Sequence, residues 1–216
     1  MPRMKIFNTL EQATFDTPPA FNSAERKQFF ALPLMLQDAM AGLRTPTNKV
    51  CFLAAVGYFK ARRKFFARNV NSADIDYIAR QLNLNITDVD VSSYTKFACI
   101  HHQRIILDYF GCRPFDAKTM AFAKSEIAML APVQYQPKQI LIEIIQILSR
   151  EKIEVPSYNV LADLIITAIS QHKHTLSNII HHGLNETQRS KLDALLEKEN
   201  DNTTTEGWHY RLTLLK

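Results

Sequence analysis

A chain of 216 residues with 46% apolar side chains is long enough for one large domain or two small ones with a real hydrophobic core. Its three cysteines follow no disulfide-framework spacing and stand beside apolar neighbours, so we expect reduced, buried thiols. The N-terminus lacks the apolar stretch of a signal peptide, and no segment has the length of a membrane span. These features argue against a secreted disulfide scaffold or an integral membrane protein and predict a soluble, cytoplasmic one.

The positive charge is concentrated in the first half of the chain. Residues 1–115 carry 15 lysines and arginines against 9 aspartates and glutamates, whereas residues 116–216 carry 11 against 12. The two parts therefore have net charges of +6 and −1. A surface that binds a polyanion is expected in the first half.

Helix start and stop signals follow one another along the whole chain, and the alternation typical of strands is almost absent. Thr45-Pro46, Asp116 and Pro137 are expected helix starts, and Gly111 is an expected helix end. Helices are predicted over residues 23–30 (with Ser23 as N-cap), 33–42, 45–63, 72–82, 93–109, 116–130, 137–148, 156–182 and 185–199. The predicted fold class is all-α, with eight or nine helices.

Two polar stretches suggest how these helices are divided. Residues 84–92 resemble a connector, and residues 200–207 form a polar break. We expect a first helical unit over 1–88, a second over 89–183, and a charged helix with the start of a downstream region over 184–216. Because Leu212, Leu214 and Leu215 would be exposed at a native C-terminus, we expect the chain to be the front of a longer protein.

The segment from Arg44 to Arg68 is basic and free of acidic residues. No acidic side chain lies between Asp38 and Asp74, and aromatic residues are interleaved with the basic ones. The basic residues are Arg44, Lys49, Lys60, Arg62, Arg63, Lys64 and Arg68. Such a segment suits a polyanion such as the DNA backbone. Composition alone allows equally a solvated basic helix whose aromatic side chains lie in the core.

A helix that begins at Thr45-Pro46 presents free backbone N–H groups and the hydroxyls of Thr45 and Thr47, which could clamp a phosphate. Asn48 and Lys49 in its first turn could reach base edges. Lys60, Arg63 and Lys64 are spaced to share one helix face, and Arg62 and Arg68 extend the charge, so we expect phosphate contacts there. The alternatives are plain capping for Thr45, Thr47 and Asn48, and a solvated face for Lys60 to Arg68.

A second group of candidates comprises His101, His102, Arg104 and Arg113. On a helix, His101 and Arg104 share a face with Tyr94 and Phe97 on the turns before them. The alternative is that the histidines are ordinary surface or core residues. A metal site of Cys99, Cys112 and the two histidines is disfavoured, because adjacent histidines on a helix diverge and no Cys-x-x-Cys pair exists. No metal or other cofactor is expected.

Several blocks in order resemble the N-terminal region of the Tn-three family of replicative transposases. They are Phe30-Ala31-Leu32-Pro33, Leu43 to Lys49 with Gly57-Tyr58, Tyr77 to Leu82, His101 to Ile105 with Gly111 to Phe115, Val155 to Tyr158, and Arg211 to Lys216. The resemblance implies two tandem helical, helix-turn-helix-like units that bind double-stranded DNA at the terminal inverted repeats of a transposon, and it implies further contacts from the 101–113 block. Strand cleavage in that family belongs to a distant C-terminal domain with an acidic triad, so this chain is expected to bind DNA without being an enzyme. It also implies association with the nucleoid when bound. The sequence leaves the oligomeric state open, and a homodimer formed through the full-length protein is one possibility.

Two other functions are compatible with the sequence. A helical interaction or dimerisation module would use the apolar helix at 140–148 and the charged helix at 185–199 as its contact surface. A helical hydrolase would use His101, His102 and Asp108, but the second acidic cluster that a metal phosphohydrolase needs is missing.

Overall fold

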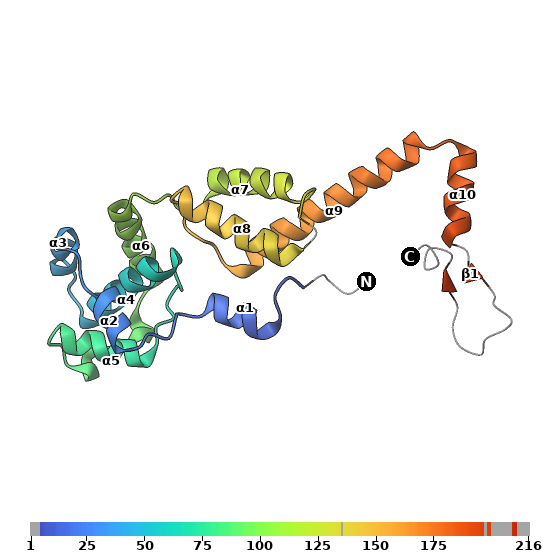
Figure 1. Cartoon of the computed structure of the whole chain (residues 1–216). Coiled ribbons are helices and arrows are strands. Elements are labelled where there is room, and N and C mark those ends of the chain that lie inside the picture. Colours follow the sequence, from blue (N-terminus) through green and yellow to red (C-terminus); the bar gives the residue numbers. More distant parts are fainter. Residues whose placement is uncertain (1–4, 135, 197, 200–208, 211–216) are drawn as a thin grey trace. The chain divides into compact units, whose positions relative to one another are not determined.

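The structure is a computed structural model, and it describes residues 5–134, 136–196, 198–199 and 209–210. The all-α fold class is confirmed, as Figure 1 shows. The α-helices are α1 (Thr9–Asp16), α2 (Ser23–Phe29), α3 (Gln37–Ala41), α4 (Pro46–Arg62), α5 (Ser72–Gln81), α6 (Lys96–Phe110), α7 (Ala117–Leu130), α8 (Pro137–Arg150), α9 (Tyr158–Gly183) and α10 (Glu186–Leu196). Three 3-10 helices, η1 (Leu34–Leu36), η2 (Ile86–Asp88) and η3 (Val91–Ser93), and a short antiparallel pair, β1 (Lys198–Glu199) and β2 (His209–Tyr210), complete the described elements. The predicted polar break at 200–207 and the leucines at 212, 214 and 215 lie outside the described residues.

The local signals for the ends of the helices act as predicted. The Thr45 hydroxyl accepts a hydrogen bond from the Asn48 backbone N–H at 3.1 Å, and Pro46 occupies the first turn of α4. The Asp116 carboxylate accepts from the first turn of α7, and Pro137 opens α8. Gly111 ends α6 in the left-handed region, at φ 60°. Each of these residues begins or ends a helix through its own backbone conformation or through contacts with residues a few positions away. Its effect can therefore be predicted from the sequence.

Several helix starts differ from the prediction: α6 begins at Lys96 rather than near Ser93, the helix predicted over 33–42 is divided into η1 and α3, and two further starts have an unpredicted capping box. The N-cap of α2 is Asn22 rather than Ser23: its side chain accepts from the Glu25 N–H at 2.9 Å, while the Glu25 carboxylate accepts from the Asn22 N–H at 2.8 Å. The same reciprocal box, Asn8 with Glu11, begins α1, which the sequence analysis did not predict. Both follow the spacing of a capping box, with asparagine as the cap.

The chain forms two compact units, residues 1–169 and 170–216. The first unit contains two large hydrophobic clusters. The first core is built by α2, α4, α5 and α6, and the second core by residues 6–7, α1, α7, α8 and the beginning of α9. Because Ile106 and Leu107 of α6 belong to the first core, the division predicted at residue 88 falls inside one cluster. Residues 84–92 form the two short 3-10 turns η2 and η3.

Helix α4 is the centre of the first core. Its buried residues occupy all sides of the helix and are Thr47, Val50, Cys51, Phe52, Leu53, Ala54, Val56, Gly57, Tyr58 and Phe59. Gly57 is required by close packing, because a Cβ there would lie 2.3 Å from the Cδ1 atom of Phe30. Each large buried side chain contributes about 1.5–3 kcal/mol to folding. A helix so enclosed cannot lie along a groove of DNA, because mainly its first and last turns reach solvent.

Helix α8 has the corresponding place in the second core, as the sequence predicts from its apolar composition. Ile140, Leu141, Ile144 and Leu148 are fully buried, within the cluster that includes residues of α7 and α9. These four side chains are the apolar surface that the interaction-module hypothesis assigned to a partner. They are already covered within the chain, so that part of the hypothesis is wrong.

The second unit contains the later part of α9, α10 and the β1–β2 pair. The predicted cap of α10 is confirmed, because the Asn185 side chain accepts from the Gln188 N–H at 2.9 Å. Leu176, Ile179 and Ile180 are exposed on α9. Among the described residues, no helix combines the length and the apolar character that crossing a bilayer requires.

Candidate nucleic-acid interface

Five of the predicted DNA contacts lie in the first turn of α4 or just before it, and one of them is buried. The Thr47 hydroxyl accepts a hydrogen bond from the Asp90 N–H at 3.0 Å, so Thr47 fastens η3 to α4 and cannot face DNA. Thr45 caps its own helix, as the capping alternative held, but remains exposed. Arg44 is exposed, and Asn48 and Lys49 are half-buried.

Lys60 closes the C-terminal end of α2. Its Nζ donates to the carbonyl oxygens of Ala31 at 2.9 Å and Phe29 at 3.3 Å. Carbonyls at a helix end lack intrahelical partners, and a lysine satisfies them well. Partial burial lowers the pKa of Lys60. The role that the structure gives Lys60 is therefore a helix cap, not a phosphate contact.

The helix face expected from Lys60, Arg63 and Lys64 does not form, because α4 ends at Arg62. Arg63 adopts the left-handed conformation, with φ 53°, and its backbone N–H donates to the Phe59 carbonyl. The Arg63 guanidinium lies over the rings of Phe59 and Phe110, at 5.7 Å and 5.4 Å from the ring centres. Arg63 is thus held by aromatic rings, while its neighbour Arg62 is exposed.

The prediction of a phosphate contact is most clearly wrong at Lys64, because this residue is only 5% exposed. Its Nζ donates to the Asp16 carboxylate at 2.5 Å and to the Pro156 carbonyl at 3.3 Å, and it lies 3.8 Å from the centre of the Phe15 ring. Burial lowers the pKa of Lys64, and the ion pair with Asp16 opposes that shift. An ammonium enclosed in this way is not available to DNA.

These contacts join the two cores of the first unit. The Asp16 carboxylate also accepts from the Tyr158 backbone N–H at 3.1 Å, at the start of α9. Beside it the Val155 N–H donates to the Arg63 carbonyl at 2.8 Å. We call the group of Asp16, Lys64, Pro156 and Tyr158 the Asp16–Lys64 clamp. The end of the predicted basic segment is therefore a structural junction.

His102 is a core residue, as one alternative held. It is 1% exposed, its Nδ1 shares a hydrogen bond of 2.8 Å with the Tyr94 hydroxyl, and its ring meets Phe52 edge-on at 5.1 Å. Burial lowers the pKa of His102 to about 4, so the ring is neutral at physiological pH. The prediction of a DNA contact at His102 is wrong for this reason, and Tyr94, which was expected on the face of His101 and Arg104, is also buried.

The opposite side of α6 faces solvent. Inward-pointing Cys99, His102, Ile106 and Leu107 hold α6 to the rest of the unit. Exposed side chains recur at the complementary positions; we call this set, Lys96, Phe97, Ile100, His101 and Arg104, the α6 face. No acidic residue occurs from Val91 to Leu107, and the exposed Asp108 follows one turn after Arg104. The α6 face therefore combines cationic, aromatic and aliphatic groups with no negative charge between them.

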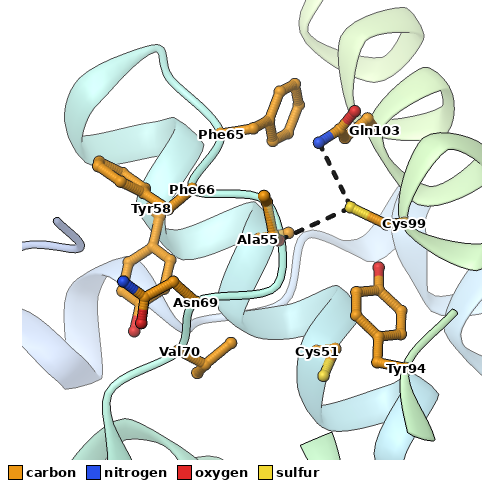
Figure 2. A pocket seen from close by; sticks show the side chains of 11 residues that line it. Cys51, Ala55, Tyr58, Phe65, Phe66, Asn69, Val70, Tyr94, Cys99 and Gln103 are labelled. Carbon is orange, nitrogen blue, oxygen red and sulfur yellow. Dashed lines mark hydrogen bonds between the residues drawn. The ribbon is translucent and has the colours of Figure 1, made fainter. Parts of the chain in front are cut away.

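The loop over residues 65–70 is fastened beneath α6, as Figure 2 shows. The Cys99 thiol donates to the Ala67 carbonyl at 3.6 Å and accepts from the Gln103 amide at 3.5 Å. Ala67 has a positive φ of 51°. The next residue, the exposed Arg68, donates to the Tyr94 carbonyl at 3.5 Å, just before α6. This loop places Arg68 near the N-terminal end of α6, where Lys96 also lies.

The space between these side chains is not a ligand site. Its volume is about 10 Å³, and its lining includes Cys51, Tyr94 and Cys99. A cavity of this size admits at most one water molecule. Burial raises the pKa of the Cys51 thiol to about 12, which leaves it protonated and unreactive. This small cavity lies on the buried side of α6, and the thiols of Cys51 and Cys99 line it.

Helices α4 and α6 run in the same direction. Cys51 clusters with Tyr94 and Cys99 near their beginnings, Phe52 meets His102, and Phe59 meets Phe110 near their ends at 5.4 Å. Both N-termini therefore lie at one end of the helix pair. That end carries the basic residues Arg44, Lys49, Arg68 and Lys96.

Both cores fall within a single family match. The profile of the domain of unknown function DUF4158 matches residues 6–168. The chain belongs to this family. No curated protein matches it. The matched residues of this DUF4158 member contain every predicted DNA contact, from Arg44 to Arg113.

Arg113, the last of the predicted DNA contacts, is exposed in this DUF4158 domain, but it also holds two parts of the fold together. Its guanidinium donates to the Glu151 carbonyl at 3.3 Å, and its backbone pairs with Lys152 and Glu154 in a parallel bridge. Arg113 thus ties the α6–α7 connection to the turn after α8. Near the bridge, burial raises the pKa of Glu154.

In the described part of this DUF4158 member, no cluster of three or more histidine, cysteine, aspartate or glutamate side chains could hold a metal ion. Cys99 lies near Tyr94, whereas Cys112 accepts from the Arg63 guanidinium at 3.6 Å in the first core. The structure offers instead a rigid, exposed and cationic helix face on α6.

Proposed function

We propose that this chain binds double-stranded DNA through the α6 face, as the non-catalytic part of a replicative transposase that recognises terminal inverted repeats. The observation that carries the proposal is the exposed, acid-free set of Lys96, His101 and Arg104 on one side of a helix whose other side is buried. The transposase identity rests on the ordered sequence blocks that resemble the Tn-three family.

The shape and charge of α6 suit the major groove. A single α-helix fits that groove, and side chains on its outer face reach the base edges. Arg104 has the planar donor fork that pairs with guanine or with a phosphate. Lys96 and Arg68, near the start of α6, can bind the flanking phosphates.

Helix α4 has a supporting part in this proposal. Its body is buried, so the reading helix is α6 rather than α4. Arg44 and Lys49 keep a role at the end that α4 shares with α6, where they extend the cationic surface toward neighbouring phosphates. Exchanging both for alanine is expected to weaken binding to all duplexes by a similar factor and to reduce the salt dependence.

The test is a titration of the whole chain with a terminal inverted-repeat duplex and with a scrambled duplex of equal length, across a salt series. We expect preference for the repeat near physiological salt, and a loss of about tenfold or more for the double variant Lys96→Ala, Arg104→Ala. Arg80→Ala, an exposed arginine on α5, is the matched control and should bind normally. Unchanged affinity of the double variant would exclude α6, and equal, salt-labile binding to both duplexes would exclude end recognition.

A protein-interaction function is the second candidate, and the exposed Leu176, Ile179 and Ile180 on α9 favour it. They recur on one side of the helix, which is the spacing of a helix–helix contact. Sedimentation of the chain with and without DNA separates the two candidates. A stable dimer that ignores DNA would favour the interaction module.

A further inference from the structure

The α6 face contains two apolar side chains that folding does not explain. Phe97 is 82% exposed and Ile100 is 49% exposed, on the same side of α6 as Arg104. They lie three residues apart, so their Cβ atoms are neighbours on the helix surface, about 5–6 Å from each other. Exposed apolar groups set among cations are typical of a surface that meets a partner.

The major groove offers one apolar group, the C5 methyl of thymine. The other base-edge groups exposed there are hydrogen-bond donors or acceptors, and phenylalanine is among the side chains that contact the thymine methyl. Lys96, His101 and Arg104 surround Phe97 and Ile100 without any acid from Val91 to Leu107. The charge thus favours a polyanion, and within a polyanionic duplex the apolar pair matches thymine.

We infer that Phe97 and Ile100 determine sequence specificity by packing against thymine methyl groups in the major groove. The inference rests on the proposed function and makes it specific. Successive base pairs rise by about 3.4 Å, so the two side chains span neighbouring or next-nearest pairs. The recognised sequence therefore contains thymines within one or two steps of each other, on either strand.

The first turn of α6 is rigid enough for such recognition. The Thr95 hydroxyl accepts from the Ala98 N–H at 3.1 Å and fixes the start of the helix. Cys99 is hydrogen-bonded to the Ala67 carbonyl, and His102 to Tyr94, on the inner side. Because the backbone beneath Phe97 and Ile100 is held on its inner side, their positions are set before DNA arrives.

The experiment replaces thymines one at a time by deoxyuridine, which removes only the methyl group. A tight duplex is first selected from a random-sequence pool with the whole chain, and affinities are then measured for the unsubstituted protein and for Phe97→Ala and Ile100→Ala. At one or two thymines we expect deoxyuridine to weaken binding by the unsubstituted protein by about three- to tenfold. At those positions the matching alanine variant should no longer distinguish thymine from deoxyuridine.

Met129→Ala, an exposed apolar residue on α7, is the matched control and should keep the full discrimination. Thermal unfolding of each variant verifies that it is folded. If deoxyuridine is tolerated at every position while the double variant Lys96→Ala, Arg104→Ala still loses affinity, the thymine inference fails and the proposed function survives. If no duplex is enriched and binding is weak for every sequence, both fail. If the alanine variants fold and bind DNA normally but lose a protein partner, the apolar pair is a protein contact.

Discussion

Individual basic residues in this chain have two different functions, and their surroundings distinguish them. Lys60, Arg63 and Lys64 are held by carbonyl oxygens, aromatic rings and a carboxylate inside the first unit. Arg62 and Arg104 stand in solvent. A run of basic residues in a sequence can therefore contain side chains that are held by contacts within the fold as well as side chains that are exposed to solvent. Only the exposed side chains can bind a polyanion.

Lys64→Ala should destabilise the protein by about 2 kcal/mol, because it leaves the Asp16 carboxylate and the Pro156 carbonyl without their donor. This value is below that of a fully buried pair, since Asp16 is a third exposed. Chemical denaturation measures the change. Arg62→Ala, two positions earlier and exposed, is the control and should alter stability by under about 0.5 kcal/mol. Equal effects of the two would contradict a buried role for Lys64.

Stability should rise with pH between about 4 and 6.5, in part because of His102. Burial depresses the pKa of His102 to about 4, so in this range the unfolded chain binds a proton that the folded chain does not. The contribution is fully present above pH 6.5 and is lost as the pH falls toward 4. His102→Gln should flatten the curve of unfolding free energy against pH, whereas His101→Gln, its exposed neighbour, should flatten it far less, because the charge of His101 is the smaller cause of the lowered pKa of His102. An unchanged slope in His102→Gln would assign the pH dependence to other groups.

At the scale of elements, α4 and α6 differ in exposure, although the sequence predicts DNA contacts from both. The helix entered at Thr45-Pro46 has the appearance of a recognition helix, yet its residues from Val50 to Phe59 fill the first core. Helix α6 keeps one side free. Which helix is central depends on the packing of α2, α5 and α6 around α4, and this is a property of the assembled unit.

Gly57→Ala tests the packing around α4 through the sign of its effect. Helix propensity alone predicts that alanine stabilises a helix interior by about 1 kcal/mol relative to glycine. In this structure the added Cβ would meet the Phe30 ring at 2.3 Å, so we expect destabilisation of about 1–3 kcal/mol instead. Thermal and chemical unfolding of the variant give the sign. A more stable variant would mean that α2 does not approach α4 this closely.

Much of the fold was predictable from sequence because its signals are local, whereas the candidate site was only partly predictable. Caps such as Thr45 and Asp116 act within three residues. The partners of Lys64 are 48 and 92 positions away, and no local pattern announces them. His101 and Arg104 were placed on one face correctly, but Lys96 and Ile100 were missed. Cys99, His102 and Ile106 are spaced at three and four residues, as the buried side of a helix is. The exposure of Lys96 and Ile100 could have been predicted from their places away from the centre of that side.

At the scale of the whole molecule, the Asp16–Lys64 clamp is one of the polar links between the cores of the first unit. Asp16→Ala and Lys64→Ala should each destabilise the protein, and the double variant should lose clearly less than the sum, because both remove the same contact. A double-mutant cycle measures this coupling. The exposed pair of Lys138 and Glu11 is the control and should show no measurable coupling. Additive effects at the clamp would mean that the ion pair does not hold the cores together.

The N-terminal residues belong to the second core, although the first core lies between them and the rest of it in the sequence. The Phe7 backbone N–H donates to the Tyr158 hydroxyl at 3.1 Å, and their rings stack at 5.3 Å across 151 positions. During synthesis the first core can close as soon as α6 has emerged from the ribosome. Helix α1 and the residues before it are synthesised earlier than the first core, and Phe7 and Phe15 have no partner in the second core until α9 appears. A segment made before the first core is thus among the last to pack, and its apolar side chains favour aggregation until it does.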